Sequence, residues 1–166
     1  FAVLLPDEIL ISRNRYSDLS RMVKNFHKNG KCQVLVEEVP KNLLSNYGVV
    51  KLVTDNLSVN TPLSVLEIIE KPKHNLAPSN KRVVGRYILE SSIFEYLRKT
   101  KPGKDNEIQL TDSLKDYILD NKDSLQATLS DSQVFDCGSL KGFLSANITL
   151  GLKDKELKKI IMEIIN

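Results

Sequence analysis

Residues 17–39 read Ser-Asp-Leu-Ser-Arg-Met-Val-Lys-Asn-Phe-His-Lys-Asn-Gly-Lys-Cys-Gln-Val-Leu-Val-Glu-Glu-Val, a helix pattern followed directly by a strand pattern. Ser17 is a suitable helix N-cap, and Gly30 is the residue type that most often ends a helix. Apolar residues between them recur at helical spacing and are expected on one face: Leu19, Met22, Val23 and Phe26. The stretch therefore predicts a helix over 17–29 and a strand over 32–39.

Strand and helix patterns alternate on both sides of this stretch. Residues 1–5, before Pro6-Asp7, form an apolar run that is typical of a buried parallel strand. Further strands are expected at 47–53, 63–70, 83–89, 125–129 and 133–135, and helices at about 91–99, 109–120, 139–149 and 153–164. Loop or turn chemistry separates them at 73–80 and 100–106. This alternation favours an α/β or mixed α+β layer fold, and we expect one domain over 1–166.

Composition excludes several classes of protein. The net charge is only +3, and positive and negative side chains are interspersed, so no basic block is present for nucleic acid or a membrane surface. No apolar run approaches the roughly 20 residues that cross a bilayer, and no signal peptide is visible. Cys32 and Cys137 lack metal-ligand spacing; we expect free thiols in a reducing, cytoplasmic setting, with a disulfide as the alternative.

Both ends of the chain are apolar. Phe1 opens an apolar run with no initiator Met, so we expect a fragment, or a chain whose upstream part was cleaved or never built. The final expected helix carries a wide apolar face, formed by Leu157, Ile160, Ile161, Ile164 and Ile165. Either this domain or another subunit must cover such a face.

Two aspartates follow apolar strands, and ligands in open α/β sheets bind outside the carboxyl ends of strands. Asp7 follows residues 1–5, and Asp136 follows residues 133–135. Mg²⁺ takes one or two carboxylates plus phosphate oxygens, so both aspartates are candidate ligands. The alternatives are a turn residue bonding its own backbone for Asp7, and an N-cap or turn residue for Asp136.

Two further clusters lie at strand ends. Lys71 carries an ammonium that suits a phosphate, and the carboxylate of Glu70 can accept hydrogen bonds from sugar hydroxyls. A Glu–Lys pair on a solvated turn is the alternative. Gly48 opens an apolar strand beside Tyr47, where a glycine lets the backbone approach a ligand. An ordinary turn glycine is the alternative here.

Together, in this order and spacing, the clusters resemble bacterial UTP–glucose-1-phosphate uridylyltransferases. The most specific stretches are Ala77-Pro78-Ser79-Asn80, Val84-Gly85-Arg86-Tyr87 and Glu107-Ile108-Gln109-Leu110-Thr111-Asp112. Glu70-Lys71-Pro72 and Asp136-Cys137-Gly138 are shared with other sugar-1-phosphate nucleotidyltransferases. The resemblance implies a Rossmann-like mixed α/β sheet of the nucleotide-diphospho-sugar transferase type, flanked by helices. It implies the C-terminal, sugar-phosphate-binding part, with the N-terminal half missing.

The resemblance also implies roles for individual residues. Asp7 matches the catalytic aspartate that holds Mg²⁺, and Asp136 matches a second aspartate near the same ion. Lys71 matches the catalytic lysine that contacts the sugar phosphate. The remaining matches concern the sugar: Glu70 for its hydroxyls, Gly48 with Tyr47 beside it, and Tyr87 in the pocket lining. Glu8 is given no role.

The implied reaction joins UTP and glucose 1-phosphate into UDP-glucose and pyrophosphate, with Mg²⁺ as cofactor. Family members hold the triphosphate on a Gly-rich loop that would precede Phe1, and no such loop is present in this chain. We therefore expect poor UTP binding and no turnover by this chain alone, and self-association as in the family. The alternatives are a transferase that uses dTTP or ATP, and a non-catalytic sugar-phosphate-binding or oligomerisation module.

Overall fold

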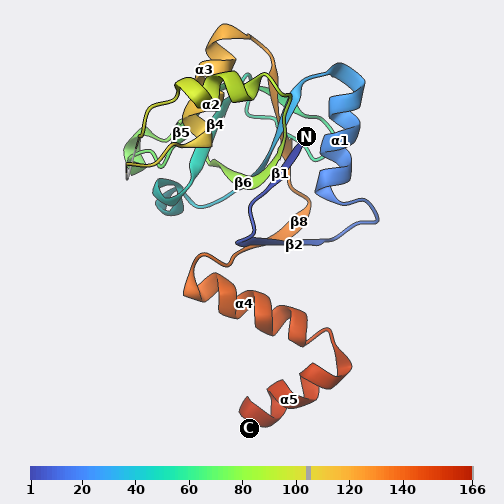
Figure 1. Cartoon of the computed structure of the whole chain (residues 1–166). Helices are drawn as coiled ribbons and strands as arrows, with labels where there is room; N and C mark the ends of the chain where they lie inside the picture. The colour runs from blue at the N-terminus through green and yellow to red at the C-terminus, as the bar shows by residue number, and fades with distance from the viewer. Residues whose placement is uncertain (104–105, 166) are drawn as a thin grey trace.

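The computed structural model describes residues 1–103 and 106–165, and it has a mixed α/β fold, as predicted (Figure 1). Six strands form one sheet in the order β1-β6-β3-β7-β5-β4. They are β1 (Ala2–Leu4), β3 (Cys32–Glu38), β4 (Gly48–Leu52), β5 (Leu63–Glu70), β6 (Lys81–Ile88) and β7 (Leu125–Leu129). Only β3 and β7 pair in parallel. A pairing of Val49 with Arg82 also joins β4 to β6, so five of these strands close into a ring of pairings.

Helices cover both faces of this sheet. On one side lies α1 (Asp18–Asn29), and on the other lie α2 (Ile93–Lys99) and α3 (Leu110–Asp120) (Figure 1). Strand β3 explains the layering, because its side chains alternate between the two faces. Leu35 packs in the cluster that contains Met22 of α1, whereas Val34 and Val36 pack in the larger cluster that contains Leu114 of α3.

The predicted capping of α1 is confirmed. The Ser17 hydroxyl accepts a hydrogen bond from the Ser20 amide at 3.2 Å. Gly30 adopts φ 72°, in the left-handed region, and donates its amide to the Phe26 carbonyl. Met22 is fully buried, but the prediction that Val23 lies on the same inward face is wrong, since Val23 is exposed. It sits about 100° around the helix from Met22, outside the narrow stripe that touches the sheet.

The prediction that residues 1–5 form a buried parallel strand is wrong. Strand β1 lies at the edge of the sheet and pairs antiparallel with β6. Leu4 is 51% exposed, and Phe1 stacks on Phe94 of α2 with ring centroids 5.1 Å apart. An apolar run shows that a strand forms, but it does not say which strand lies beside it.

Several elements escaped the sequence analysis. Strand β2 (Glu8–Ser12) pairs antiparallel with β8 (Ser132–Asp136) in a separate two-stranded sheet. Two short 3₁₀ helices, Lys41–Asn46 and His74–Leu76, lie in expected loops or linkers. The turn predicted over 100–106 falls partly on residues 104 and 105, which lie outside the described residues.

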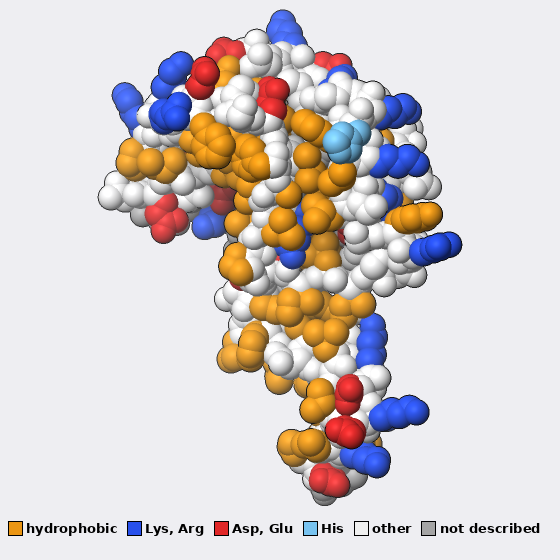
Figure 2. Space-filling view, turned by 45° about the vertical axis from the view of Figure 1, so that its right-hand side comes forward, with side chains coloured by type: hydrophobic (Ala, Val, Ile, Leu, Met, Phe, Trp, Pro, Cys, Tyr) orange, Lys and Arg blue, Asp and Glu red, His pale blue; other side chains and the backbone are white. Residues whose placement is uncertain are grey.

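At the C-terminus, α4 (Leu140–Gly151) and α5 (Lys155–Ile165) extend away from the body (Figure 1). Hydrophobic side chains gather on this arm (Figure 2), and α5 has no buried residue. Leu157, Ile160 and Ile164 are all exposed, so the described part of the domain leaves the face open. That another subunit covers this apolar face stays a prediction. No helix within the described ranges has the length and apolarity to span a bilayer.

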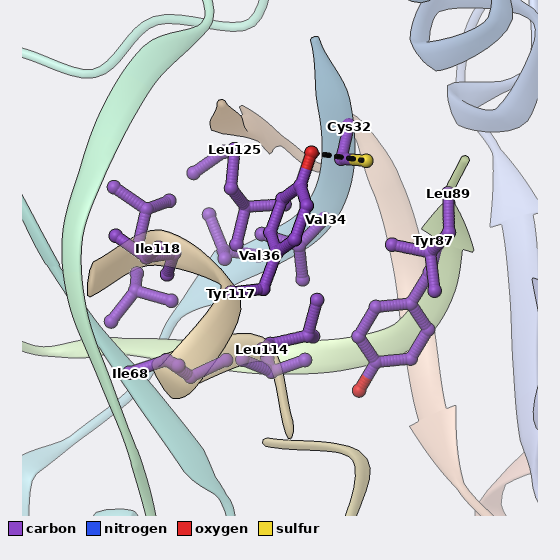
Figure 3. Packing of buried hydrophobic residues seen from close by; sticks show 14 of the residues in the cluster. Cys32, Val34, Val36, Ile68, Tyr87, Leu89, Leu114, Tyr117, Ile118 and Leu125 are labelled. Atoms are coloured by element: carbon purple, nitrogen blue, oxygen red, sulfur yellow. Dashed lines mark hydrogen bonds between the residues drawn. The ribbon is translucent and has the colours of Figure 1, made fainter. Parts of the chain in front are cut away.

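Both cysteines are free thiols, as predicted, but their surroundings differ. Cys32 is 1% exposed in the larger hydrophobic cluster, and its thiol donates a hydrogen bond to the Tyr117 hydroxyl at 3.8 Å (Figure 3). Burial raises the pKa of the Cys32 thiol above its usual value. Cys137 is only half-buried.

We therefore expect a thiol reagent such as DTNB to label Cys137 well before Cys32 in the folded protein, because the reactive form is an accessible thiolate. Absorbance of the released thionitrobenzoate should rise in two separated phases, and denaturant should merge them. Cys137→Ser should abolish the fast phase only. Equal rates for the two thiols in the folded protein would contradict this expectation.

Candidate functional site

A cleft of about 1090 Å³ contains all seven residues singled out from the sequence. They are Asp7, Tyr47, Gly48, Glu70, Lys71, Tyr87 and Asp136. These residues come from five separate segments of the chain, and the fold brings them to one place. Their chemical roles stay predictions.

Asp7 and Asp136 meet at one end of the cleft. The β2–β8 pairing places Glu8 opposite Asp136, and the Cys137 amide donates to the Asp7 carbonyl at 2.7 Å. A Cβ atom placed on Gly138 would lie 3.2 Å from Asp7 Oδ2 and 3.1 Å from Asp136 Oδ1. The two carboxylates therefore approach the same point, beside a residue that has no side chain.

This carboxylate pair fits Mg²⁺. Among the described residues no group of three or more His, Cys, Asp and Glu could enclose a metal ion. Two carboxylates are what Mg²⁺ takes from a protein when water and phosphate oxygens complete its coordination. Asp7 and Asp136 are the residues that would hold the ion.

The alternative that each aspartate is a turn residue bonding the backbone is wrong for Asp7 and holds in part for Asp136. The Asp7 side chain is exposed and makes no hydrogen bond with residues 1–103 or 106–165, so it does not bond its own backbone there. Asp136 Oδ1 accepts from the Gly138 amide at 3.1 Å, a turn bond that coexists with its place in the cleft. The N-cap of α4 is Ser139, whose hydroxyl accepts from the Gly142 amide.

Tyr47 connects to Asp136 directly. Its hydroxyl donates to Asp136 Oδ2 at 2.8 Å. Burial, reinforced by this bond to a carboxylate, raises the pKa of Tyr47 to about 12. The hydroxyl thus remains a protonated donor at neutral pH, and both Asp136 oxygens are held by hydrogen bonds from within the chain.

An arginine that the sequence analysis did not single out lies under Tyr47. The Arg82 guanidinium sits 4.2 Å from the centroid of the Tyr47 ring. Its NH1 donates to Glu8 Oε1 at 2.6 Å, and its Nε donates to Glu37 Oε1 at 2.5 Å. Arg82 is only 2% exposed and Glu8 only 8%. No signal in the sequence pointed to Arg82 or Glu8, because both lie outside the strands that were expected, at 83–89 and 1–5.

Gly48 is closely packed where it lines the cleft. It lies opposite Glu70 in the β4–β5 register, and Glu70 Oε2 accepts from the Thr111 hydroxyl at 2.8 Å. A Cβ on Gly48 would come within 3.1 Å of Thr111 Cγ2 and 3.2 Å of Glu70 Oε2. Gly48 opens a strand, so the ordinary turn alternative is wrong, and Thr111 is a cleft residue that the sequence analysis did not single out.

Lys71 and Tyr87 complete the set. Lys71 has φ 42°, a left-handed conformation that is uncommon and costly for a lysine and tends to occur at functional sites. Its amide donates to the Tyr47 carbonyl at 3.0 Å, which fixes the exit of β5 against the start of β4. Tyr87 is buried in the larger hydrophobic cluster beneath the cleft, and burial raises the pKa of its hydroxyl (Figure 3).

Comparison with known proteins points to one family. The family model of nucleotidyl transferases matches residues 1–151. UTP–glucose-1-phosphate uridylyltransferase of Haemophilus ducreyi is 34% identical over 99% of this chain and 57% of its own length. The Escherichia coli protein of that name is 35% identical over 94% of this chain and 51% of its own length. The chain thus spans about half the length of these relatives.

Solved structures agree with the sequence matches. A UTP-bound UGPase from Acinetobacter baumannii superposes with a TM-score of 0.84 at 36% identity, over 99% of this chain and 55% of that one. A UDP-glucose pyrophosphorylase complexed with UDP-glucose superposes with a TM-score of 0.86 at 36% identity, over 93% of this chain and 56% of that one. A putative glucose-1-phosphate thymidylyltransferase from Bacillus anthracis gives 0.66 at 24% identity, a likeness of fold alone.

Proposed function

The chain belongs to the nucleotidyl transferase family, and from that premise we propose that it is the C-terminal, sugar-phosphate-binding part of a UTP–glucose-1-phosphate uridylyltransferase. The whole enzyme would join UTP and glucose 1-phosphate into UDP-glucose and pyrophosphate. The observation that carries the proposal is that a carboxylate pair and the Glu70-Lys71 pair line the same cleft.

At the metal end, Asp7 and Asp136 would hold Mg²⁺, which supplies charge neutralisation at the phosphates. Asp7 is exposed and accessible to an ion, while Asp136 is oriented by Tyr47 and Gly138. Transfer of this kind consists mostly of positioning and electrostatic stabilisation. No side chain has to form a covalent intermediate.

At the sugar end, the Glu70 carboxylate would accept hydrogen bonds from sugar hydroxyls through Oε1, while Thr111 holds Oε2. The Lys71 ammonium would bind the sugar phosphate as a point charge. Gly48 would present its backbone to the sugar, with Tyr47 beside it and Tyr87 in the pocket lining. A phosphate oxygen of the sugar phosphate would then attack the α-phosphorus of UTP, and pyrophosphate would leave.

The residues that select the base are proposed to lie in the half of the relatives that this chain does not span. For that reason dTTP and ATP stay alternative nucleotides. A non-catalytic sugar-phosphate-binding or oligomerisation module is the other alternative, and the half-length match is the observation that favours it. We also propose that the whole enzyme self-associates and is cytoplasmic.

Lys71→Ala should weaken glucose 1-phosphate binding by about 10-fold to 100-fold, because a hydrogen bond to a charged group contributes about 1.5–3 kcal/mol. NMR titration of the 166-residue chain suits weak binding. Lys73→Ala is the matched control, since Lys73 is exposed and lies outside the cleft lining. Equal losses in the two variants would remove Lys71 from the sugar-phosphate site.

A further inference from the structure

Arg82 occupies an unusual place for a cation. It lies within strand β6 and is almost fully buried, where an unpaired charge would be very costly. Two carboxylates hold it: Glu8, itself buried and also accepting from the Gly85 amide at 2.6 Å, and the half-buried Glu37. Arg82 lines the cleft, but Glu8 and Glu37 occupy both edges of its guanidinium.

The guanidinium also lies over the Tyr47 ring, with its central carbon 4.2 Å from the ring centroid. A cation over an aromatic face is attracted by it, and the planar guanidinium also stacks, which a lysine ammonium does not. The supported ring aims its hydroxyl at Asp136 Oδ2. This leaves Asp136 Oδ1 near Gly138, on the side where Asp7 Oδ2 also approaches.

We propose that Arg82 is a positioning residue, which acts through the Tyr47 ring to hold the Asp136 carboxylate in register with Asp7 for binding a divalent cation. Glu8 and Glu37 serve to fix the guanidinium. The inference rests on the proposed function, because it assumes that the two aspartates share an ion. In this inference Arg82 affects Asp136 only through Tyr47 and not by a separate route.

Mn²⁺ tests this, because it takes the same oxygen ligands as Mg²⁺ and broadens NMR signals of nearby nuclei. We would titrate Mn²⁺ into the ¹⁵N-labelled 166-residue chain and follow the Gly138 amide. Broadening should centre on Gly138 and should disappear in Asp7→Asn. Tyr47→Phe and Arg82→Lys should each weaken Mn²⁺ binding by about tenfold, the usual effect of removing a group that orients a ligand.

The double variant decides the question. If Arg82 acts through Tyr47, Tyr47→Phe with Arg82→Lys should bind Mn²⁺ about as well as Tyr47→Phe alone, because both changes break the same link. If the two losses in Mn²⁺ affinity multiply in the double variant, or if Arg82→Lys binds Mn²⁺ as well as the wild-type chain, the inference is overturned. The proposed metal site would not be affected by either result. Absence of broadening near Gly138 in the wild-type chain would overturn the metal site and the inference with it.

Glu37→Gln provides a second route if Arg82→Lys does not fold. It keeps Arg82 and loosens only the half-buried carboxylate that holds the guanidinium. It should weaken Mn²⁺ binding in the wild-type background and have no further effect in Tyr47→Phe. An equal loss in both backgrounds would contradict action through Tyr47.

Discussion

Arg82→Met should lower the free energy of unfolding by about 3–5 kcal/mol, because it leaves the buried Glu8 carboxylate without its cation. Glu37 is less buried and can regain water, so most of the loss is expected from Glu8. Urea unfolding followed by circular dichroism would measure it. Arg13→Met is a suitable control: Arg13 is exposed, and a substitution of that kind usually changes stability by about 0.5 kcal/mol or less.

Adding Glu8→Gln should restore much of that loss. Glutamine removes the orphaned charge, and its carbonyl can still accept the Gly85 amide that now bonds Glu8 Oε2. Replacing both members of a buried ion pair by neutral residues is often tolerated, whereas removing only one member leaves an unpaired buried charge and is strongly destabilising. If the double variant proved no more stable than Arg82→Met, packing of the Arg82 side chain against Tyr47 would be the larger contribution.

The sequence predicted those features that depend on neighbouring residues. The cap at Ser17, the helix end at Gly30 and the strand that forms β3 were all readable, because caps and local strand patterns act over a few residues. The polar residues at strand ends were readable for the same reason. Their convergence in one cleft was not readable in this way, because β1 pairs antiparallel with β6 and β8 belongs to a separate two-stranded sheet.

Features that depend on distant partners were not readable. The edge position of β1 depends on its pairing with β6, more than 80 residues away. Arg82 bonds Glu37 and Glu8 across 45 and 74 residues, and no local pattern encodes such separations. Strand β2 begins with a charged residue, Glu8, whose burial only the partner explains. The resemblance assigned no role to Glu8, and its contacts show a structural one.

Tyr47 joins the two ends of the cleft. Its hydroxyl bonds Asp136, its carbonyl accepts the Lys71 amide, and Gly48 follows it in the chain. The proposed metal site comes from segments near Asp7 and Asp136, whereas the proposed sugar site comes from the middle of the chain. A shift of Tyr47 would therefore move both ends, which gives a physical reason for fixing its ring on a buried arginine.

Asp7→Asn should reduce Mg²⁺-dependent pyrophosphate release by about a thousandfold or more in a fusion that joins Phe1 to the part of the Escherichia coli relative that this chain does not span. Metal stabilisation of transition-state charge contributes several kcal/mol, and each 1.4 kcal/mol is about tenfold in rate. Asparagine keeps the size of the side chain and removes the charge, so folding should persist. The 166-residue chain alone should show no turnover with UTP and glucose 1-phosphate.

Asp55→Asn is the matched control, because Asp55 is exposed and lies outside the cleft lining. It should leave the rate of the fusion unchanged, while Asp7→Asn should keep its glucose 1-phosphate affinity and lose its response to Mg²⁺. Retained turnover in Asp7→Asn would remove Asp7 from the metal site. Turnover by the 166-residue chain itself would mean that the triphosphate binds within these residues, and the wide cleft beside Asp7 and Asp136 would then have to hold both substrates.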